Sequence, residues 1–348
     1  MTLTHSRQNI FWMVSLIFVV FFSLIFAALF PQSSVQKSSL LSRIWDIEEK
    51  KFLTKNPEIN LILTGDMMLG RYIGTLRERA LGDEDPSNDL FPFTYMPQIF
   101  EAAKTALNTD DLDLVLGNLE GPIVEKQVAY GDMVFRFAPE VATLLKKVGF
   151  TTLQVANNHT FNQTREGLTE TYNHLDAADL DAFGYPDTSY GEFSFIRYDF
   201  EGQSLGFLGL NDTDFKMDMD EVTARIKDLD SQVDTLIVGV HWGFEYEPIA
   251  RDSVVNKAHQ MVEAGADFIW GTHPHVVQNS EVYKGTTIYY SLGNFVFDQY
   301  WSTETQKGLV LALKISAPRV EGGKAKITVT EIKIDLVNKG EPTPSNEL

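Results

Sequence analysis

The chain has 348 residues, of which 44% are hydrophobic and 12% aromatic, so it can fold around a core, and disordered or collagen-like chains are excluded. Its formal net charge of −19 argues against nucleic acid or anionic lipid as a general partner, because both are bound through Lys and Arg. The absence of cysteine excludes disulfides, thiolate metal sites and cysteine nucleophiles.

The first predicted element is a membrane helix at residues 10–30. This stretch carries no charged residue and is long enough to cross a hydrocarbon core of about 30 Å. A cleaved signal peptide has a shorter apolar region of about 7–15 residues, so we expect an uncleaved anchor. The positive charges on its two sides nearly balance, with Arg7 before it and Lys37 and Arg43 after it. The charges alone therefore leave its orientation in the membrane open. The polar residues 31–57 are expected to form a stalk with a short helix.

After the stalk, apolar runs of strand length alternate with helical patterns. Buried strands are predicted at residues 59–64, 112–116, 151–156, 205–210, 235–240 and 268–270. The clearest helices are 139–148 and 253–264, and each is followed by a glycine of the kind that ends a helix. Segments 285–292, 308–316 and 325–336 alternate with turns and predict antiparallel strands. This order predicts an α/β fold with helices on the faces of a sheet.

Polar side chains follow five of these strands at the point where each strand ends. In α/β sheets, functional sites collect beyond the carboxyl ends of the strands. The residues concerned are Asp66, Asn118, Glu120, Asn158, His159, His241, His273 and His275. Because they follow separate strands in a chain with only 7 His, we expect them to meet at one edge of the sheet.

These residues offer oxygen and imidazole nitrogen atoms as metal ligands, and no sulfur. Such a ligand set suits Mn, Zn or Fe. The predicted ligands of one or two divalent metal ions are Asp66, Glu120, Asn158, His241, His273 and His275. A bridging carboxylate such as Glu120 can hold two ions about 3.5–4 Å apart, where they activate water. His159 is the predicted catalytic residue, protonating a leaving group or stabilising a transition state.

Each of these motifs also has a structural interpretation. A Gly-Asp pair after a strand is commonly a turn, and Asn157-Asn158 can be a turn pair. His273 and His275 are stronger evidence for a site, because alternate residues of an extended segment point the same way.

Further residues are predicted to contact substrate. Arg71 offers a planar fork for a carboxylate or a phosphate. The region around Asn294 can equally be a Gly/Asn turn. The complete predicted set is Arg71, Asn118, Glu245 and Asn294.

A series of motifs in this chain resembles the bacterial capsule-synthesis CapA family, the accessory component of poly-γ-glutamate production. The motifs are GDMMLGR (65–71), GNLEGP (117–122), ANNH with FNQTREG (156–167), HWGFEYEP (241–248), EAGADFIWGTHPHVVQ (263–278) and YSLGNFVFDQ (290–299). The resemblance implies a calcineurin-like metallophosphatase-type αββα sandwich at residues 58–338, before a polar tail at 339–348. It also implies a cytoplasmic N-terminus at residues 1–9, an N-terminal transmembrane helix and a large extracytoplasmic domain at the cell membrane.

The resemblance also implies roles for single residues, with one departure from the metallophosphatase pattern. Asp66 is similar to the leading aspartate, Glu120 to the bridging carboxylate, Asn158-His159 to the asparagine ligand and acid pair, and His241, His273 and His275 to the remaining imidazoles. Met68 stands where the pattern has a His, and a thioether is a poor ligand for a hard divalent ion. One metal position is therefore left with Asp66, Glu120 and His275 at most.

Three functions are consistent with these features. The first is a membrane-anchored accessory role in the biosynthesis or export of poly-γ-glutamate or a related anionic polymer, beside a membrane-bound polymer ligase or export complex. The second is metal-dependent hydrolysis of a phosphoester or a γ-glutamyl amide. The third is a non-catalytic scaffold. With a net charge of −19, an anionic polymer must be captured locally, by bound cations, Arg71 and Arg136.

Overall fold

The computed structural model describes residues 58–81, 90–185, 194–214, 216–317, 324–338 and 340–345. The predicted membrane helix at 10–30 and the stalk at 31–57 lie outside these residues. Within the described ranges, no helix is long and apolar enough to cross a membrane. Residues 341–344, expected in the polar tail, form a strand that pairs with the strand before it.

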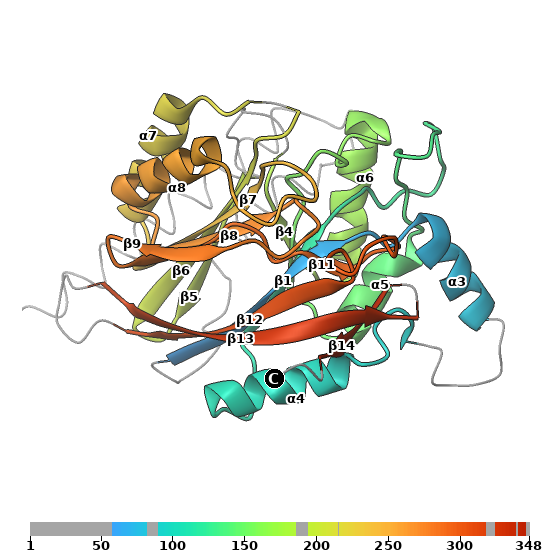
Figure 1. The fold of residues 1–348 in the computed structure, drawn as a ribbon, viewed down its shortest axis with the longest axis horizontal. Helices are drawn as coiled ribbons and strands as arrows, with labels where there is room; N and C mark the ends of the chain where they lie inside the picture. Colours follow the sequence, from blue (N-terminus) through green and yellow to red (C-terminus); the bar gives the residue numbers. More distant parts are fainter. Residues whose placement is uncertain are drawn as a thin grey trace, which may run out of the picture. The chain divides into compact units, whose positions relative to one another are not determined.

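The first of the sheets carries the N-terminal strands (Figure 1). Within the described residues it has eight strands, with β11 paired to β1 beside the path β14-β13-β12-β1-β2-β3-β4. Strands β1 to β4 pair in parallel, whereas β12, β13 and β14 pair antiparallel. The bounds are β1 (Glu58–Met67), β2 (Leu114–Leu119), β3 (Thr152–Gln154), β4 (Asp181–Phe183), β11 (Asn294–Val296), β12 (Lys307–Ser316), β13 (Lys326–Val337) and β14 (Glu341–Pro344).

The second sheet is formed by the middle of the chain. Over the described ranges it has six strands in the order β5-β6-β7-β8-β10-β9. The bounds are β5 (Phe195–Phe200), β6 (Gln203–Asn211), β7 (Thr235–His241), β8 (Phe268–Thr272), β9 (Ser280–Tyr283) and β10 (Thr286–Tyr289). Strands β6, β7, β8 and β10 are parallel, and the edge strands β5 and β9 are antiparallel to their neighbours.

Helices cover the outer face of each sheet (Figure 1). The bounds are α3 (Arg71–Leu81), α4 (Met96–Leu107), α5 (Glu140–Lys147), α6 (Thr164–Ala177), α7 (Met219–Asp230) and α8 (Asp252–Ala264). A core that includes Ile62 of β1 and Ile99 of α4 joins the first sheet to α4, α5 and α6. Another core, with Val238 of β7 and Ile226 of α7, joins the second sheet to α7 and α8.

The two sheets pack face to face through a separate core. Leu61 and Leu63 of β1 lie in this core with Phe207 and Ile237 of the second sheet, while Ile62 between them faces the helices. This alternation follows from the two-residue period of a strand. The α/β prediction and the αββα layering are therefore confirmed.

The predicted elements agree with the structure in most places. The helices at 139–148 and 253–264 are confirmed as α5 and α8, and the antiparallel strands at 308–316 and 325–336 as β12 and β13. The prediction of an antiparallel strand within 285–292 is only half right, because β10 pairs antiparallel with β9 and parallel with β8. The turn at Lys284 and Gly285, both with positive φ, reverses the chain at this point.

The carboxyl ends of strands from both sheets meet in this fold. Trp270 Nε1 of β8 donates a hydrogen bond to the carbonyl oxygen of Thr64 in β1 at 3.1 Å. At Gly65 a Cβ atom would lie 1.9 Å from the Gly293 oxygen, so glycine permits the close approach of the β11 segment. The site residues therefore come from two sheets, and the expectation of one edge of a single sheet is wrong.

Candidate metal centre

A first group of possible metal ligands consists of Asp66, Glu120 and His275, all of them buried. Asp66 lies near the end of β1, Glu120 follows β2 and His275 follows β8. One ligand atom from each lies within 4.8 Å of the others. His275 Nδ1 is 3.4 Å from Asp66 Oδ2, and His275 Nε2 is 3.6 Å from Glu120 Oε1. These three residues are the ones that remain at one predicted metal position, because Met68 stands there in place of a His.

A second group shares His275 and adds His273 and Glu245. Here too the possible ligand atoms lie within 4.8 Å of one another. Glu245, which we expected to contact substrate, is therefore placed where its carboxylate can bind a cation. The two groups overlap at His275, whose ring can therefore serve an ion in either group.

His241 and Asn158 lie beside these groups and contact each other. His241 Nε2 is 2.9 Å from Asn158 Oδ1, and His241 Nδ1 is 3.0 Å from Thr272 Oγ1. The His241 ring centroid lies 4.8 Å from that of His273. Burial, together with the nearby His273 and His275, holds the pKa of His241 well below its usual value. The structure therefore brings both predicted ligands to the centre, with a neutral imidazole at His241.

Unpaired buried atoms show that the centre suits a cation. Both carboxylate oxygens of Glu120 and Nδ1 of His273 are buried without a hydrogen-bond partner among the described residues. Unpartnered buried polar atoms are costly and uncommon in proteins. Burial and the charge of Asp66 raise the pKa of Glu120, and burial lowers the pKa of His273 to about 3. Carboxylates beside neutral imidazoles form the kind of donor set that binds a divalent metal.

The backbone at His273 and His275 differs from the expected extended segment. His273 has φ of 99° and His275 of 59°, so both residues adopt left-handed conformations. Such conformations are uncommon for residues with a side chain and are found where the surrounding structure holds them in place. The expectation of alternate residues on a strand is wrong, yet the two rings still lie 6.0 Å apart.

Asn118 and Asn294 contact two of the possible ligands, Asp66 and His275, and fix their orientation. Asn118 Nδ2 donates to Asp66 Oδ1 at 2.8 Å, and Asn118 Oδ1 accepts from Asn157 Nδ2. Asn294 Nδ2 donates to Gln299 and to a backbone carbonyl, and Asn294 Oδ1 lies 3.0 Å from His275 Nδ1. Both amides are engaged within the protein. These contacts favour a positioning role over the substrate contact that we expected.

His159 lies next to Glu120 in a fixed orientation. Its Nε2 is 3.8 Å from Glu120 Oε1, and its ring stacks on Phe135 at 3.8 Å between centroids. Asn162 Oδ1 accepts from the Phe135 backbone N–H and lies 2.9 Å from His159 Nδ1, so Nδ1 carries the proton. Asn162 was not predicted as a site residue, although it follows His159 by three positions in the sequence.

The protonation state of His159 bears on its predicted role. Burial lowers its pKa to about 4. At pH 7 only about one His159 ring in a thousand then carries the extra proton. The unprotonated Nε2 can accept a proton or a hydrogen bond, whereas the predicted leaving-group acid would need the rare imidazolium form.

Arg71 lies at the border of the centre. Its guanidinium forms an ion pair with Asp298 and lies over the ring of Phe135, with Cζ 5.0 Å from the ring centroid. Its positive charge acts to lower the pKa of Glu120 and His159. The side chain is 27% exposed, so one face can meet an anionic group from solvent.

Met68 takes no part in the polar arrangement. Its side chain is buried in the core on the helix side of the first sheet. Its sulfur accepts a hydrogen bond from the Gly70 backbone N–H at 3.3 Å.

Two exposed aromatic residues that were not predicted as site residues lie near His275. The Tyr246 ring lies 6.2 Å from that of His275 and 6.0 Å from that of Trp301. Tyr246 is 43% exposed and Trp301 62%. Tyr246 lies within the HWGFEYEP motif, whereas Trp301 lies beyond the last motif quoted above.

Comparison with known proteins gives a family match over most of the described chain. The family described as bacterial capsule synthesis protein PGA_cap matches residues 60–299. PGA biosynthesis protein CapA of Bacillus subtilis (strain 168) is 28% identical over 323 residues, covering 88% of this chain and 76% of that protein. Capsule biosynthesis protein CapA of Bacillus anthracis is 30% identical over 280 residues, covering 74% of this chain and 64% of that protein.

More distant similarities were also found. A protein of Mycobacterium tuberculosis, named as a probable polyglutamine synthesis accessory protein, is 25% identical and covers 70% of this chain and 76% of that protein. Among solved structures, a phosphatase from Mycoplasma pneumoniae gives a TM-score of 0.48 at 16% identity, over 80% of this chain and 94% of that one. A hypothetical protein from Thermus thermophilus gives 0.47 at 18% identity, over 79% and 99%.

Proposed function

Because this chain belongs to the bacterial capsule synthesis protein PGA_cap family, we propose that it is an accessory protein in the biosynthesis or export of poly-γ-glutamate. The main support is that the family match over residues 60–299 includes every residue of the metal centre, from Asp66 to Asn294. The names of the Bacillus relatives support the same role.

The accessory role includes a place at the cell membrane. The uncharged segment at residues 10–30 supports a single N-terminal anchor. The large domain is extracytoplasmic in this proposal, where a secreted polymer is accessible. The partner is a membrane-bound ligase or export complex that this chain does not include.

Within this role the residues of the centre would hold a divalent metal ion. Such an ion would polarise a carbonyl or phosphoryl oxygen and lower the pKa of water. Asp66, Glu120 and His275 would hold it, and Asn118 and Asn294 orient two of these ligand side chains.

His159 supplies a proton acceptor next to these ligands. Its Nδ1 proton is held by Asn162, so the lone pair is on Nε2, the atom 3.8 Å from Glu120 Oε1. This arrangement supports a second candidate function, hydrolysis of a γ-glutamyl amide or a phosphoester, which trims or releases the polymer. A non-catalytic scaffold remains the alternative.

The accessory role is tested by gene deletion followed by complementation. Deletion should reduce the amount or change the length of surface polymer, and the wild-type gene should restore it. Asp66→Ala should fail to restore it, whereas Asp228→Ala, an exposed residue paired with Arg225, should succeed. Unchanged polymer after deletion would contradict the accessory role. Full restoration by Asp66→Ala would favour the scaffold.

The hydrolase candidate is tested with the purified full chain in detergent. With Mn²⁺ or Zn²⁺ present, the wild type should release product from a γ-glutamyl oligomer or an aryl phosphate. Asp66→Ala and His273→Ala should lose this activity together with bound metal, measured by elemental analysis. Turnover that persists in both variants would contradict a role of this centre.

A further inference from the structure

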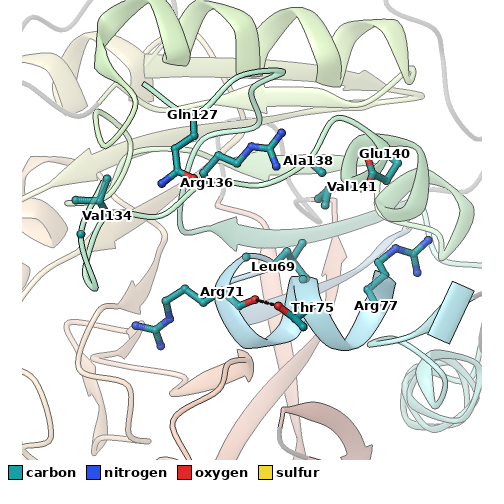
Figure 2. A pocket seen from close by; sticks show the side chains of 13 residues that line it. Leu69, Arg71, Thr75, Arg77, Gln127, Val134, Arg136, Ala138, Glu140 and Val141 are labelled. Atoms are coloured by element: carbon teal, nitrogen blue, oxygen red, sulfur yellow. Dashed lines mark hydrogen bonds between the residues drawn. The ribbon is translucent and has the colours of Figure 1, made fainter. Parts of the chain in front are cut away.

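A pocket of about 270 Å³ lies between the start of α3 and the loop that follows Glu120. Its described lining residues are Leu69, Gly70, Arg71, Gly74, Thr75, Arg77, Gln127, Gly131, Val134, Arg136, Ala138, Glu140 and Val141. Figure 2 shows these side chains above and below the pocket, with α3 on one side and the loop that carries Arg136 on the other. The metal centre and its proposed chemistry do not use this space.

The walls of the pocket continue directly from two metal ligands. Residues 69–71 follow Asp66, and the loop at 121–139 follows Glu120. At Gly70 a Cβ atom would lie only 2.5 Å from the Arg136 carbonyl oxygen, so the two walls are in close contact there. The pocket is therefore held at a fixed place relative to the metal centre.

The pocket concentrates positive charge in an acidic protein. Arg71, Arg77 and Arg136 are among its lining residues, Glu140 is the one carboxylate among the described ones, and the charge of Arg71 is paired with Asp298. The whole chain carries a net charge of −19. At physiological salt, charges more than about 8 Å apart are largely screened from each other. An anion inside the pocket is therefore attracted by the arginines next to it more than it is repelled by distant carboxylates.

Arg136 is held in place without a carboxylate partner. Its Nε donates to the Val124 carbonyl at 3.2 Å, and its Nη2 donates to the Glu125 carbonyl at 2.8 Å. Both acceptors are neutral, and no ion pair of Arg136 occurs within the described part of the chain. The guanidinium thus keeps its charge available while its orientation is already fixed, which lowers the entropic cost of binding.

Arg71 connects the pocket to the metal centre. Arg71 is one of the lining residues of the pocket, and its guanidinium lies over Phe135, the same ring on which His159 stacks. The pocket and the metal centre are thus neighbouring sites that share Arg71.

We propose that this pocket is a carboxylate-binding subsite for an acidic polymer, in which Arg136 binds the carboxylate of a unit next to the one at the metal centre. The inference rests on the proposed function and names the part of the chain that holds the polymer. Arginine suits this task because its planar donors match a carboxylate. The volume is slightly below the range of about 300–1,000 Å³ for ligand sites, which suits a short stretch of polymer.

The subsite is tested by calorimetric titration of the full chain in detergent with a γ-linked glutamate oligomer and Mn²⁺. Arg136→Gln should weaken binding about tenfold or more, because a hydrogen bond to a charged group is lost. Arg136→Lys keeps the charge and should recover part of this loss. Bound metal should be unchanged in both variants. Arg197→Gln, which removes an exposed arginine paired with Asp199 on β5, should bind like the wild type.

The outcomes separate this inference from the accessory role. Equal affinity of the wild type and Arg136→Gln, or no binding of the oligomer to the wild type, would overturn the subsite. The deletion experiment decides the accessory role independently. Inorganic phosphate provides the competing anion. If phosphate binds in an Arg136-dependent manner and displaces the oligomer at equal concentration, the pocket is a phosphate site and the carboxylate assignment is wrong.

Discussion

His275 Nδ1 lies 3.0 Å from the side-chain oxygen of Asn294, and this contact decides which nitrogen of His275 keeps its lone pair. The Asn294 amide nitrogen already donates to Gln299 and to the Thr305 carbonyl, so its oxygen must accept. The proton of His275 is therefore on Nδ1, and Nε2, 3.6 Å from Glu120 Oε1, is left with its lone pair. Residues that fix a ligand ring in this way raise metal affinity without touching the metal.

Asn294→Ala should therefore weaken metal binding by about 10–100-fold. The ligands remain, but the His275 ring loses the partner that fixes its tautomer. Metal titration monitored by calorimetry measures the change. Asn256→Ala on the exposed side of α8 serves as the matched control. Unchanged affinity in Asn294→Ala would show that the contact does not support the centre.

Metal removal should destabilise the wild type, because the buried Glu120 carboxylate then lies beside Asp66 without compensation. An ion present at 100 times its dissociation constant adds about 2.7 kcal/mol to the free energy of unfolding. Glu120→Gln removes the buried negative charge, so this variant should melt no lower than the wild type in chelator and gain less from added metal. Thermal melting with and without Mn²⁺ checks both statements. An equal gain in both proteins would contradict the ligand role of Glu120.

Met68→Leu should leave the metal content unchanged, because the Met68 side chain packs in the core and its sulfur accepts a hydrogen bond from Gly70. The exchange conserves volume, so the cost in stability should stay below about 1.5 kcal/mol. Elemental analysis beside the wild type is the measurement. Loss of an ion on substitution would mean that the thioether is a ligand after all.

Asn162→Ala should free the His159 ring and leave the Phe135 backbone N–H without its acceptor. An unsatisfied buried donor costs about 1–3 kcal/mol in the free energy of unfolding. Nitrogen NMR of the imidazole should show a protonated Nδ1 in the wild type and a mixture of tautomers in the variant. If the wild type already shows a protonated Nε2, the assignment of His159 as a proton acceptor at that atom is wrong.

Glu281→Gln tests a pH dependence away from the metal centre. A hydrogen bond from Tyr290, with a further one from His259, lowers the pKa of Glu281. A lowered folded-state pKa stabilises the protein above the unfolded value of about 4.5, and this contribution is lost as the pH falls through the folded value. The stability difference between wild type and Glu281→Gln should therefore shrink as the pH falls from 6 toward 4. Urea unfolding measures it, with the exposed Glu201→Gln as control, and a constant difference would contradict the linkage.

Much of the architecture could be predicted from local patterns. Apolar runs located strands such as β1, β7 and β8, because burial on both faces requires continuous hydrophobic residues. Amphipathic spacing located α5 and α8. The residues of a strand do not specify its partners, and for this reason the parallel pairing of β10 with β8 was not predicted.

For this chain, the sequence by itself determined the donor set: which carboxylates, amides and imidazoles follow the strands, and that Met68 breaks the pattern. Only the tertiary structure decided how these donors are combined. His273 N donates to Asp66 across 207 positions of sequence, and Arg71 pairs with Asp298 across 227. The first contact depends on the packing of the two sheets against each other, and the second on the pairing of β11 with β1 within one sheet. The left-handed backbone at His273 and His275 has no local signal, and residue order does not show that two ligand groups share His275.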